Sequence, residues 1–217
     1  MTTEEKKSVF IICSVRKANA ATREALVGYK QKLLSQGYVN VHLPHLDTNQ
    51  NATGYEICVQ NTTENIAATE IHVFYDVTSE GSHFDIGVQF VDSYLHPEKK
   101  FYVVEYLEND PLGISMQDHM YRLFEEKFEG CKRWINILET IMGVDDLLVS
   151  YYPQNIQASH LELGMLFALC TFYPEKRIKV IHNGGIVHEN GQYFILFERS
   201  FGTMIMEWED AQEKKHV

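Results

Sequence analysis

Residues 71–104 read IHVFYDVTSEGSHFDIGVQFVDSYLHPEKKFYVV, and this stretch decides the fold. A short apolar run at 71–75 is followed by small and polar residues and then by an apolar pattern at helical spacing over 82–94. A second short apolar run follows at 101–104. Short apolar strands joined by a helix are typical of a parallel sheet that helices cover on both faces. The stretch therefore predicts a strand–helix–strand unit.

The same alternation precedes this unit. Residues 9–15 and 39–43 are two further β-like runs. The first is followed by a helical pattern that ends at Gly37, and the second by a polar stretch and a helical pattern over 55–68. Strands that alternate with helices predict an α/β fold, here a Rossmann-like parallel sheet sandwiched by helices.

A later stretch predicts a second, divergent copy of this unit, the alternative being two strand–helix–strand units that converged on similar patterns. Residues 159–181 match residues 82–104 without a gap, at an offset of 77 residues from Ser82 to Ser159. Ser, His, Gly, Phe and Pro-Glu-Lys recur at matching positions, and Asp85 coincides with Glu162. So long a period suits a duplicated half-domain. We therefore predict a complete α/β unit over residues 1–110 and a divergent partial repeat over 111–217, packed on the first.

The second unit opens with a long helical pattern over 118–142. A strand over 147–151, a helix over 159–172 and a strand over 178–181 follow. Residues 184–197 predict a C-terminal β-hairpin that turns at the Asn-Gly pair 190–191, because Asn-Gly favours the two-residue turns of hairpins.

Composition narrows the classes of function. A chain of 217 residues that is 45% hydrophobic can bury a full core, and it has neither an apolar run of membrane-spanning length nor a signal-peptide pattern. We expect a cytoplasmic protein that does not associate with membranes. The net charge of −11 argues against a nucleic acid polymer as partner but leaves room for a small anion in a local pocket. The four cysteines are far apart and lack metal-ligand spacing, so we expect neither a metal nor a cofactor.

Ligands of parallel α/β sheets bind outside the carboxyl ends of the strands. The loops over 13–17, 44–54 and 76–82 all leave strands at that edge, so their residues should converge there. Gly81 would let the backbone approach a ligand, while helical N–H groups and the hydroxyls of Ser79 or Ser82 would hold an anion. The local alternative is structural: Ser82 caps the helix, and Asp85 is the acid of its capping box.

Three stretches together resemble a known family. The first strand ends in the small-residue loop ICSVRKA (12–18), and the segment HLDTNQNATGYEIC (45–58) resembles a substrate loop. Residues 79–87 form a Ser-x-Gly-x-x-aromatic-acid-aliphatic-Gly motif, SEGSHFDIG. On these residues the chain resembles the nucleoside 2-deoxyribosyltransferase-like family, which includes deoxynucleoside monophosphate N-glycosidases. The resemblance covers about residues 8–105.

The resemblance implies a covalent mechanism at a nucleoside or nucleotide. In the family, the acid of the motif attacks the anomeric carbon and carries the sugar as an ester, which fits an oxocarbenium-like transition state. Position by position, this makes Asp85 the nucleophile and gives Asp76 a role in orienting the sugar or transferring a proton. The substrate-binding residues would be those of the three loops: Ser14 and Arg16 beside the sugar or phosphate; Asp47, Asn49 and Gln50 facing the base; and Ser79, Gly81 and Ser82 at the 5′ end.

Two departures from the family pattern leave alternatives open. Asp85 is one methylene shorter than the usual Glu, and a misplacement of that size can cost about a hundredfold in rate. Glu162 has the usual length, but Ile156 and Ala158 replace the Ser and Gly of the motif. Glu162 is therefore either an acid that completes the site or a charge favoured by the helix dipole. Both a homodimer and an intrachain pseudo-dimer remain open.

Two functions follow from these expectations. The first is cleavage of an N-glycosidic bond, or 2-deoxyribosyl transfer, through a carboxylate nucleophile. The alternative is a catalytically silent protein that senses or sequesters a nucleotide-derived ligand.

Overall fold

The computed structural model describes residues 7–52, 54–76, 78–104, 111–113, 135–136, 138–140, 142–143, 146–151, 156–175 and 177–182. The first part of the chain forms β1 (Ser8–Ile12), α1 (Ala20–Ser35), β2 (Asn40–His42), α2 (Pro44–Asp47), α3 (Gly54–Ala67), β3 (Glu70–Val73), α4 (Glu80–Leu95), β4 (Lys100–Val104) and β5 (Pro111–Gly113). The second part forms β6 (Asp146–Tyr151), α7 (Ile156–Phe172) and β7 (Arg177–His182).

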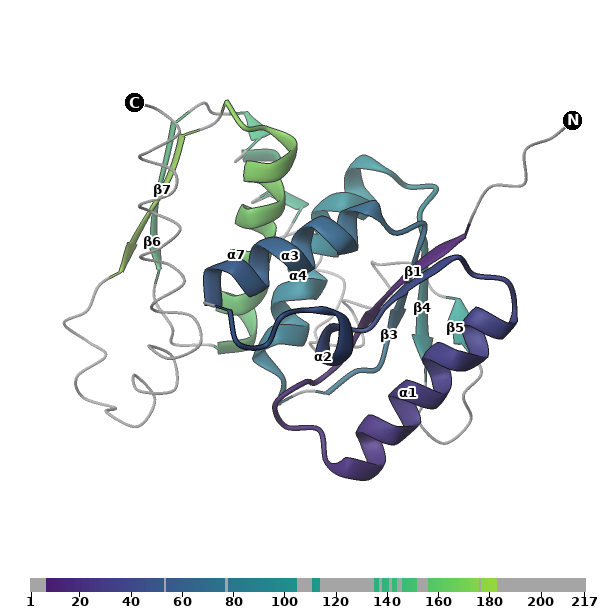
Figure 1. Ribbon diagram of the computed structural model, residues 1–217. Coiled ribbons are helices and arrows are strands. Elements are labelled where there is room, and N and C mark those ends of the chain that lie inside the picture. Colours follow the sequence, from purple (N-terminus) through teal and green to yellow (C-terminus); the bar gives the residue numbers. More distant parts are fainter. Residues whose placement is uncertain are drawn as a thin grey trace, which may run out of the picture.

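The first part is built on one sheet (Figure 1), in which the strand order is β2-β1-β3-β4-β5. The first four of these strands run parallel, with Phe10 paired to His42 on one side and to Ile71 on the other, and Ile71 paired in turn to Phe101. β5 closes the edge antiparallel to β4. The α/β fold expected from the sequence is confirmed, and the first sheet extends past residue 110.

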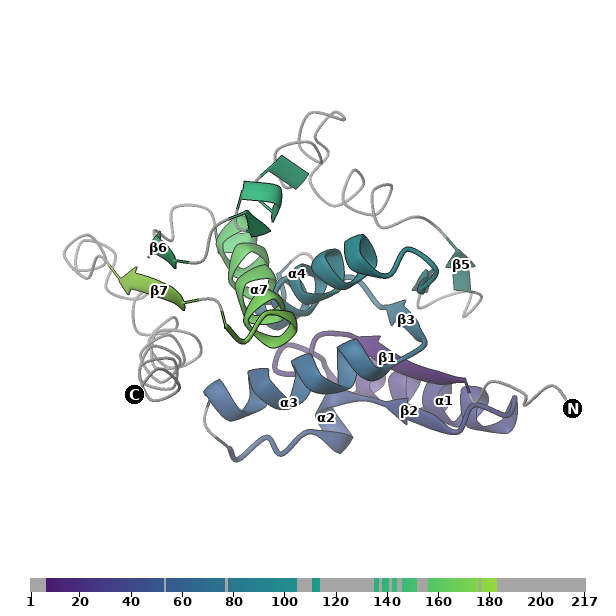
Figure 2. The same cartoon turned by 90° about the horizontal axis from the view of Figure 1, so that it is seen from above.

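Helices cover both faces of this sheet (Figure 2). Residues alternate along β1, so Val9 and Ile11 pack with Leu26 and the other buried residues of α1, while Phe10 and Ile12 pack with residues of α3 and α4. All four of these β1 side chains are almost fully buried. This two-sided burial is the reason why the strands are apolar without alternation.

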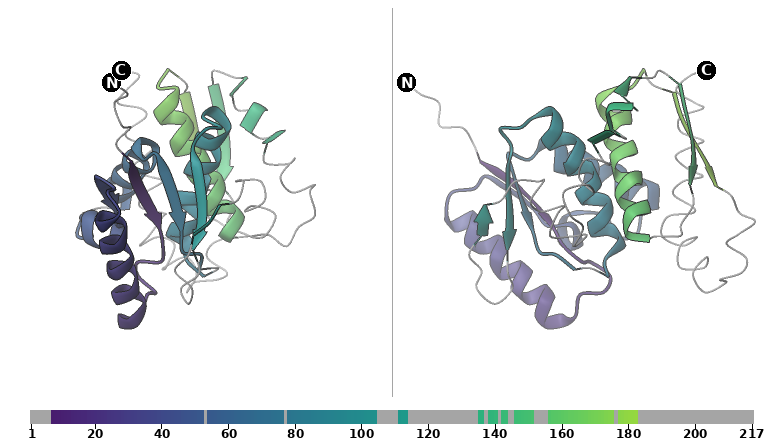
Figure 3. Two further views of the ribbon diagram at one scale, coloured as in Figure 1. Left: turned by 90° about the vertical axis from the view of Figure 1, so that its right-hand side faces the viewer. Right: turned by 180° about the vertical axis from the view of Figure 1, so that it is seen from behind.

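The second part repeats the strand–helix–strand order as a separate pair of strands. β6 and β7 are parallel, and α7 lies between them in the sequence. α7 packs along α4 (Figure 3). From Leu161 to Cys170, every residue of α7 is buried except Glu162, which is half-buried. A helix that is apolar on all sides is typical of a buried helix, and α4 is the main element that packs against α7.

Several local features depart from the sequence-based expectation. Pro44 starts the short helix α2 within a stretch that was expected to be a loop, in keeping with the preference of Pro for the first helical turn. The antiparallel strand β5 was not expected. Of the helix expected over 118–142, the structure describes 135–136, 138–140 and 142, which are helical, and the hairpin expected over 184–197 lies outside the described residues.

Two other expectations concern helix ends and membrane spans. α1 ends at the expected place, with Gln36 as C-cap and Gly37 at φ +95°, a left-handed conformation that suits Gly. Within the part of the chain that the structure describes, no helix is both long and apolar enough to cross a membrane.

Candidate active site

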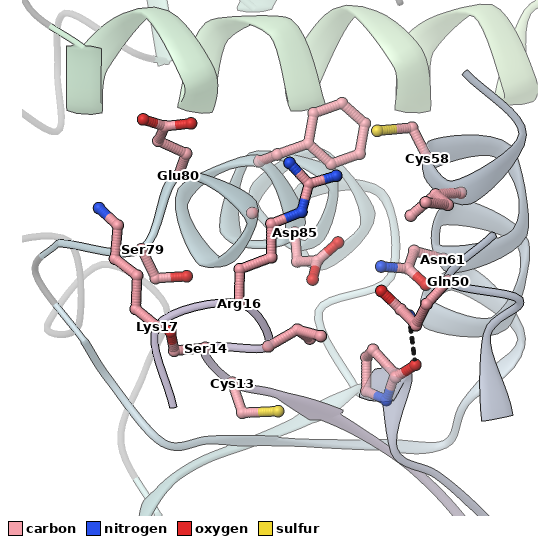
Figure 4. A pocket seen from close by; sticks show the side chains of 15 residues that line it. Cys13, Ser14, Arg16, Lys17, Gln50, Cys58, Asn61, Ser79, Glu80 and Asp85 are labelled. Carbon is pink, nitrogen blue, oxygen red and sulfur yellow. Dashed lines mark hydrogen bonds between the residues drawn. The ribbon is translucent and has the colours of Figure 1, made fainter. Parts of the chain in front are cut away.

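A pocket lies at the carboxyl edge of the sheet, between the loop after β1, the loop before α3, and the first turns of α4 (Figure 4). Its volume of about 130 Å³ is roughly ten times what one water molecule needs, so it is larger than a packing defect. The lining combines polar, charged and apolar side chains: Cys13, Ser14, Val15, Arg16, Lys17, Pro44, Gln50, Ile57, Cys58, Asn61, Ser79, Glu80, Gly81, Phe84 and Asp85.

Asp85 is the buried acid of this pocket. Its side chain comes from the second turn of α4, and the residue is only 3% exposed. Oδ1 has no hydrogen-bond partner among the described residues. Burial raises the pKa of Asp85 to about 8, although a hydrogen bond from the side chain of Asn61 opposes the increase. In the free protein, this carboxyl group is therefore mostly protonated at neutral pH.

The start of α4 differs from the capping-box alternative. Ser79, not Ser82, is the N-cap: its backbone is extended, and its Oγ accepts a hydrogen bond from the Ser82 amide at 3.3 Å. Ser82 is fully buried, donates its hydroxyl to Ser79 Oγ at 2.9 Å and does not line the pocket. The capping-box interpretation is wrong, because the helix begins at Glu80 and Asp85 lies beyond its first turn. Capping therefore gives no reason for an acid at position 85.

The pocket is lined by the first turn of α4 and by charged side chains of both signs, with Arg16 and Lys17 as the cations and Glu80 of that turn as an anion. Arg16 and Lys17 come from the loop after β1, and Ser79 and Gly81 come from the start of α4. Lys17 donates a hydrogen bond to the carbonyl of Thr78, which ties the two loops together. A helix N-terminus flanked by cations and hydroxyls is a favourable place for an anion. The loops expected to converge are therefore joined here.

Asp76 lies outside the pocket lining. It accepts hydrogen bonds from the backbone amide of Thr78 at 2.8 Å and from the Thr78 hydroxyl at 2.7 Å. Burial alone would raise its pKa, but the hydrogen bonds from Thr78, with the nearby Ser14 hydroxyl and the charge of Lys17, lower it overall. In this structure Asp76 shapes the loop that leads into α4.

Of the three residues assigned to the base, Gln50 lines the pocket, and Asp47 and Asn49 do not. Gln50 Nε2 donates to the carbonyl of Pro44 at 2.7 Å (Figure 4). Asp47 pairs with Lys30 Nζ at 2.6 Å and accepts a hydrogen bond from the Leu43 amide. These contacts make Asp47 a support of α2.

Glu162 is also absent from the pocket lining. It lies on α7, six residues into a helix that begins at Ile156, and it is half-buried. The structure thus brings Ser14, Arg16, Gln50, Ser79, Gly81 and Asp85 together and leaves Asp47, Asn49, Asp76, Ser82 and Glu162 outside the lining.

Sequence reasoning missed the wall that α3 contributes. Ile57, Cys58 and Asn61 lie on one face of this helix and line the pocket opposite the loop after β1. Their i, i+3 and i, i+4 spacing was the available signal, since such residues share a helix face. Burial, with a smaller contribution from the charge of Asp85, raises the pKa of both Cys13 and Cys58, so both thiols stay protonated.

Comparison with models of known families, with curated proteins and with solved structures found no match to this chain. Among the described residues, no group of three or more His, Cys, Asp or Glu side chains is arranged to hold a metal ion.

Proposed function

We propose that the protein binds a nucleoside or nucleotide in this pocket and breaks or exchanges its N-glycosidic bond through Asp85, as a relative of the nucleoside 2-deoxyribosyltransferases. One observation carries the proposal: a buried carboxyl group with an unpartnered oxygen lines the same pocket as Arg16, Ser79 and the first turn of α4. Arg16, Ser79 and the first turn of α4 with Gly81 are called the anion cradle below. An acid and an anion cradle in one pocket match what a sugar with a 5′ hydroxyl or phosphate requires.

The proposed chemistry has two steps. The ionised Asp85 attacks the anomeric carbon, a carbon–oxygen bond forms, and the bond from carbon to the base nitrogen breaks. The electron pair leaves with the base, which takes up a proton. Water or a second base then attacks the same carbon and releases the carboxylate. No redox change occurs, so the reaction needs no electron acceptor.

The ionisation of Asp85 sets the pH dependence that we expect. The nucleophile is the carboxylate, and the pKa of Asp85 in the free protein is about 8. Its ionised fraction therefore rises with pH, reaches one half near pH 8 and levels off above that value. We expect kcat/KM to rise over the same range, because this parameter reports ionisation of the free enzyme.

The second half of the chain enters the proposal as a divergent copy of the first. Its strand–helix–strand unit carries Glu162 at the position of Asp85 but lacks the Ser and Gly of the anion cradle. We assign Glu162 a structural role and give the second half the task of supporting α4. In this proposal the activity belongs to the first half of the chain. The expected location of the protein is the cytoplasm.

The test is to incubate the protein with nucleosides, deoxynucleoside monophosphates and NAD, and to look for free base by chromatography. We expect release from at least one of these substrates, abolished by Asp85→Ala and retained by Glu98→Gln, an exposed acid beyond the far end of α4. A 2-fluoro sugar analogue should remain covalently attached to Asp85 and be found there by mass spectrometry. Release that persists in Asp85→Ala would overturn the proposal.

A second candidate, silent binding of a nucleotide-derived ligand, is favoured by the same pKa. A carboxyl group that is protonated at neutral pH donates a hydrogen bond and is a poor nucleophile. Tight binding of a ligand from the panel, without release of base at any pH up to 9, would support this function instead.

A further inference from the structure

The helices α4 and α7 touch at two glycines. A Cβ atom added to Gly87 on α4 would lie 2.0 Å from the carbonyl oxygen of Leu161 on α7. A Cβ atom added to Gly164 on α7 would lie 2.0 Å from the carbonyl oxygen of Phe84 on α4. Backbone therefore packs directly on backbone at this crossing, and only Gly allows it.

These two contacts are reciprocal. The 77-residue offset that relates Ser82 to Ser159 also relates Gly87 to Gly164 and Phe84 to Leu161. Gly87 therefore lies against Leu161, which is the equivalent of Phe84, three residues before Gly87. In the same way Gly164 lies against Phe84, the equivalent of Leu161, three residues before Gly164. A surface in which residue i meets j and residue j meets i in the same way is the mark of a two-fold interface.

The surroundings of the crossing follow the same offset. His83 and His160 match and are both fully buried, and the proximity of His83 contributes to the low pKa of His160, although burial is the main cause. The strand pairs β3–β4 and β6–β7 flank matching helices and are both parallel. Their registers differ by one residue, since Ile71 pairs with Phe101 whereas Leu148 pairs with Lys179. The correspondence is therefore closest at the helices.

We propose that α4 and α7 meet about a pseudo-two-fold axis that passes between Gly87 and Gly164 and exchanges them, so that the second half of the chain occupies the place of a second copy in a symmetric dimer. The partner of the α4 surface is thus built into the chain. The inference concerns packing, and it stands whether or not Asp85 is a nucleophile. It also gives the second half a role, because α4 carries Gly81 and Asp85 of the pocket and is capped by Ser79.

The axis can be tested by distances in the intact chain. Tyr94, Glu98, Thr171 and Glu175 are exposed, and the offset relates the first to the third and the second to the fourth. Cysteine pairs at 94 with 175, and at 98 with 171, would carry spin labels for pulsed electron paramagnetic resonance. A two-fold axis makes these two distances equal, so their distributions should overlap. Separate distributions would overturn the proposal. Both pairs are made in a Cys131→Ser background, and that background without the added cysteines is the labelling control, since Cys13, Cys58 and Cys170 are buried.

Substitution of the glycines is an independent test. Gly87→Ala and Gly164→Ala should each lower the folded-to-unfolded ratio by roughly one to two orders of magnitude, because a methyl group at either position forces the helices apart. The double variant should lose less than the product of the two, since one displacement accommodates both methyl groups. Gly28→Ala is the matched control, because a Cβ there meets nothing within 4 Å. Clearly unequal losses or full additivity would contradict the pseudo-two-fold crossing. If either variant fails to fold, the distance comparison still decides.

Discussion

The two strand–helix–strand units share a packing surface and differ in the loop that precedes the helix. β3–α4–β4 has Ser79 and Gly81 at the start of its helix, and both line the pocket. β6–α7–β7 has Ile156 and Ala158 at the matching positions. The buried glycines are kept in both, whereas the polar cradle is present in one. The buried glycines are therefore attributed to the packing of the fold, and the polar residues at the start of α4 to the binding of a ligand.

The acids follow the same division. Asp85 lies in a pocket with an unpartnered oxygen, whereas Glu162 lies outside the lining of that pocket. A buried carboxyl group is unfavourable for stability unless something pairs with it. Its presence in the unit that also has the cradle is what a functional acid predicts, because functional sites often retain groups that destabilise the fold.

The largest difference between the two units is expected when each acid is replaced in turn by its amide. Asp85→Asn should lower the rate of base release by at least about a thousandfold, because the variant has no nucleophile. Glu162→Gln should leave the rate within about twofold of the parent, since its side chain is outside the pocket. Chromatography of released base measures both. Equal losses in the two variants would mean that the second unit contributes to the chemistry.

Asp85 also links the comparison to stability. Folding raises its pKa from an ordinary value of 3.8 to about 8, so the folded state binds an extra proton between these values. Its contribution to stability is complete below about pH 4 and is lost as pH rises through about 8. Asp85→Asn should therefore stabilise the protein at pH 9, by an amount on the order of 5 kcal/mol or less, and much less at pH 5. Urea unfolding at the two pH values measures this. An equal effect at both would show that Asp85 ionises normally.

A longer acid at position 85 tests whether the reach of its side chain limits the rate. Asp85→Glu gives the first unit the acid of the second and of the proposed family. If reach limits the rate, the variant should release base about tenfold to a hundredfold faster. Initial rates under matched substrate conditions measure the change. A slower variant with normal folding would show that the pocket is shaped for the shorter side chain.

The smallest effect is expected when the anion cradle of the first unit is given the residue of the second unit at the matching position. Gly81→Ala copies Ala158, and a Cβ at Gly81 meets nothing within 4 Å, as at Gly28. Both Gly81→Ala and Gly28→Ala should stabilise by a few tenths to about 1 kcal/mol. Only Gly81→Ala should also raise KM or the ligand Kd, because Gly81 lines the pocket. Thermal melts and ligand titrations separate the two effects. Unchanged affinity in Gly81→Ala would remove the first turn of α4 from the binding site.

Much of the fold could be predicted from the sequence, since apolar strands such as those over 71–75 and 101–104 carry their own signal. The parallel order and the convergence of the loops at 13–17 and 76–82 follow from general rules of α/β sheets. α2 and β5 could not be predicted in this way, because a four-residue helix and a three-residue edge strand depend on tertiary contacts.

The site was less predictable than the fold. Asp85 could be singled out by the motif, but its burial beside Asn61 depends on how α3 packs against α4. Asp47 and Asp76 belong to the expected loops, yet their carboxylates bond to Lys30 and Thr78. Polar residues in a loop are equally suited to binding a ligand and to holding the loop itself, and sequence alone does not separate these roles.

Both outer strands of the main sheet are three residues long: β2 at one edge and β5 at the other. β5 also begins with Pro111, which has no N–H group to offer a further strand. Edges this short give a neighbouring chain little to pair with. We therefore expect that the two edges of this main sheet do not pair with strands of a neighbouring molecule, even in concentrated preparations.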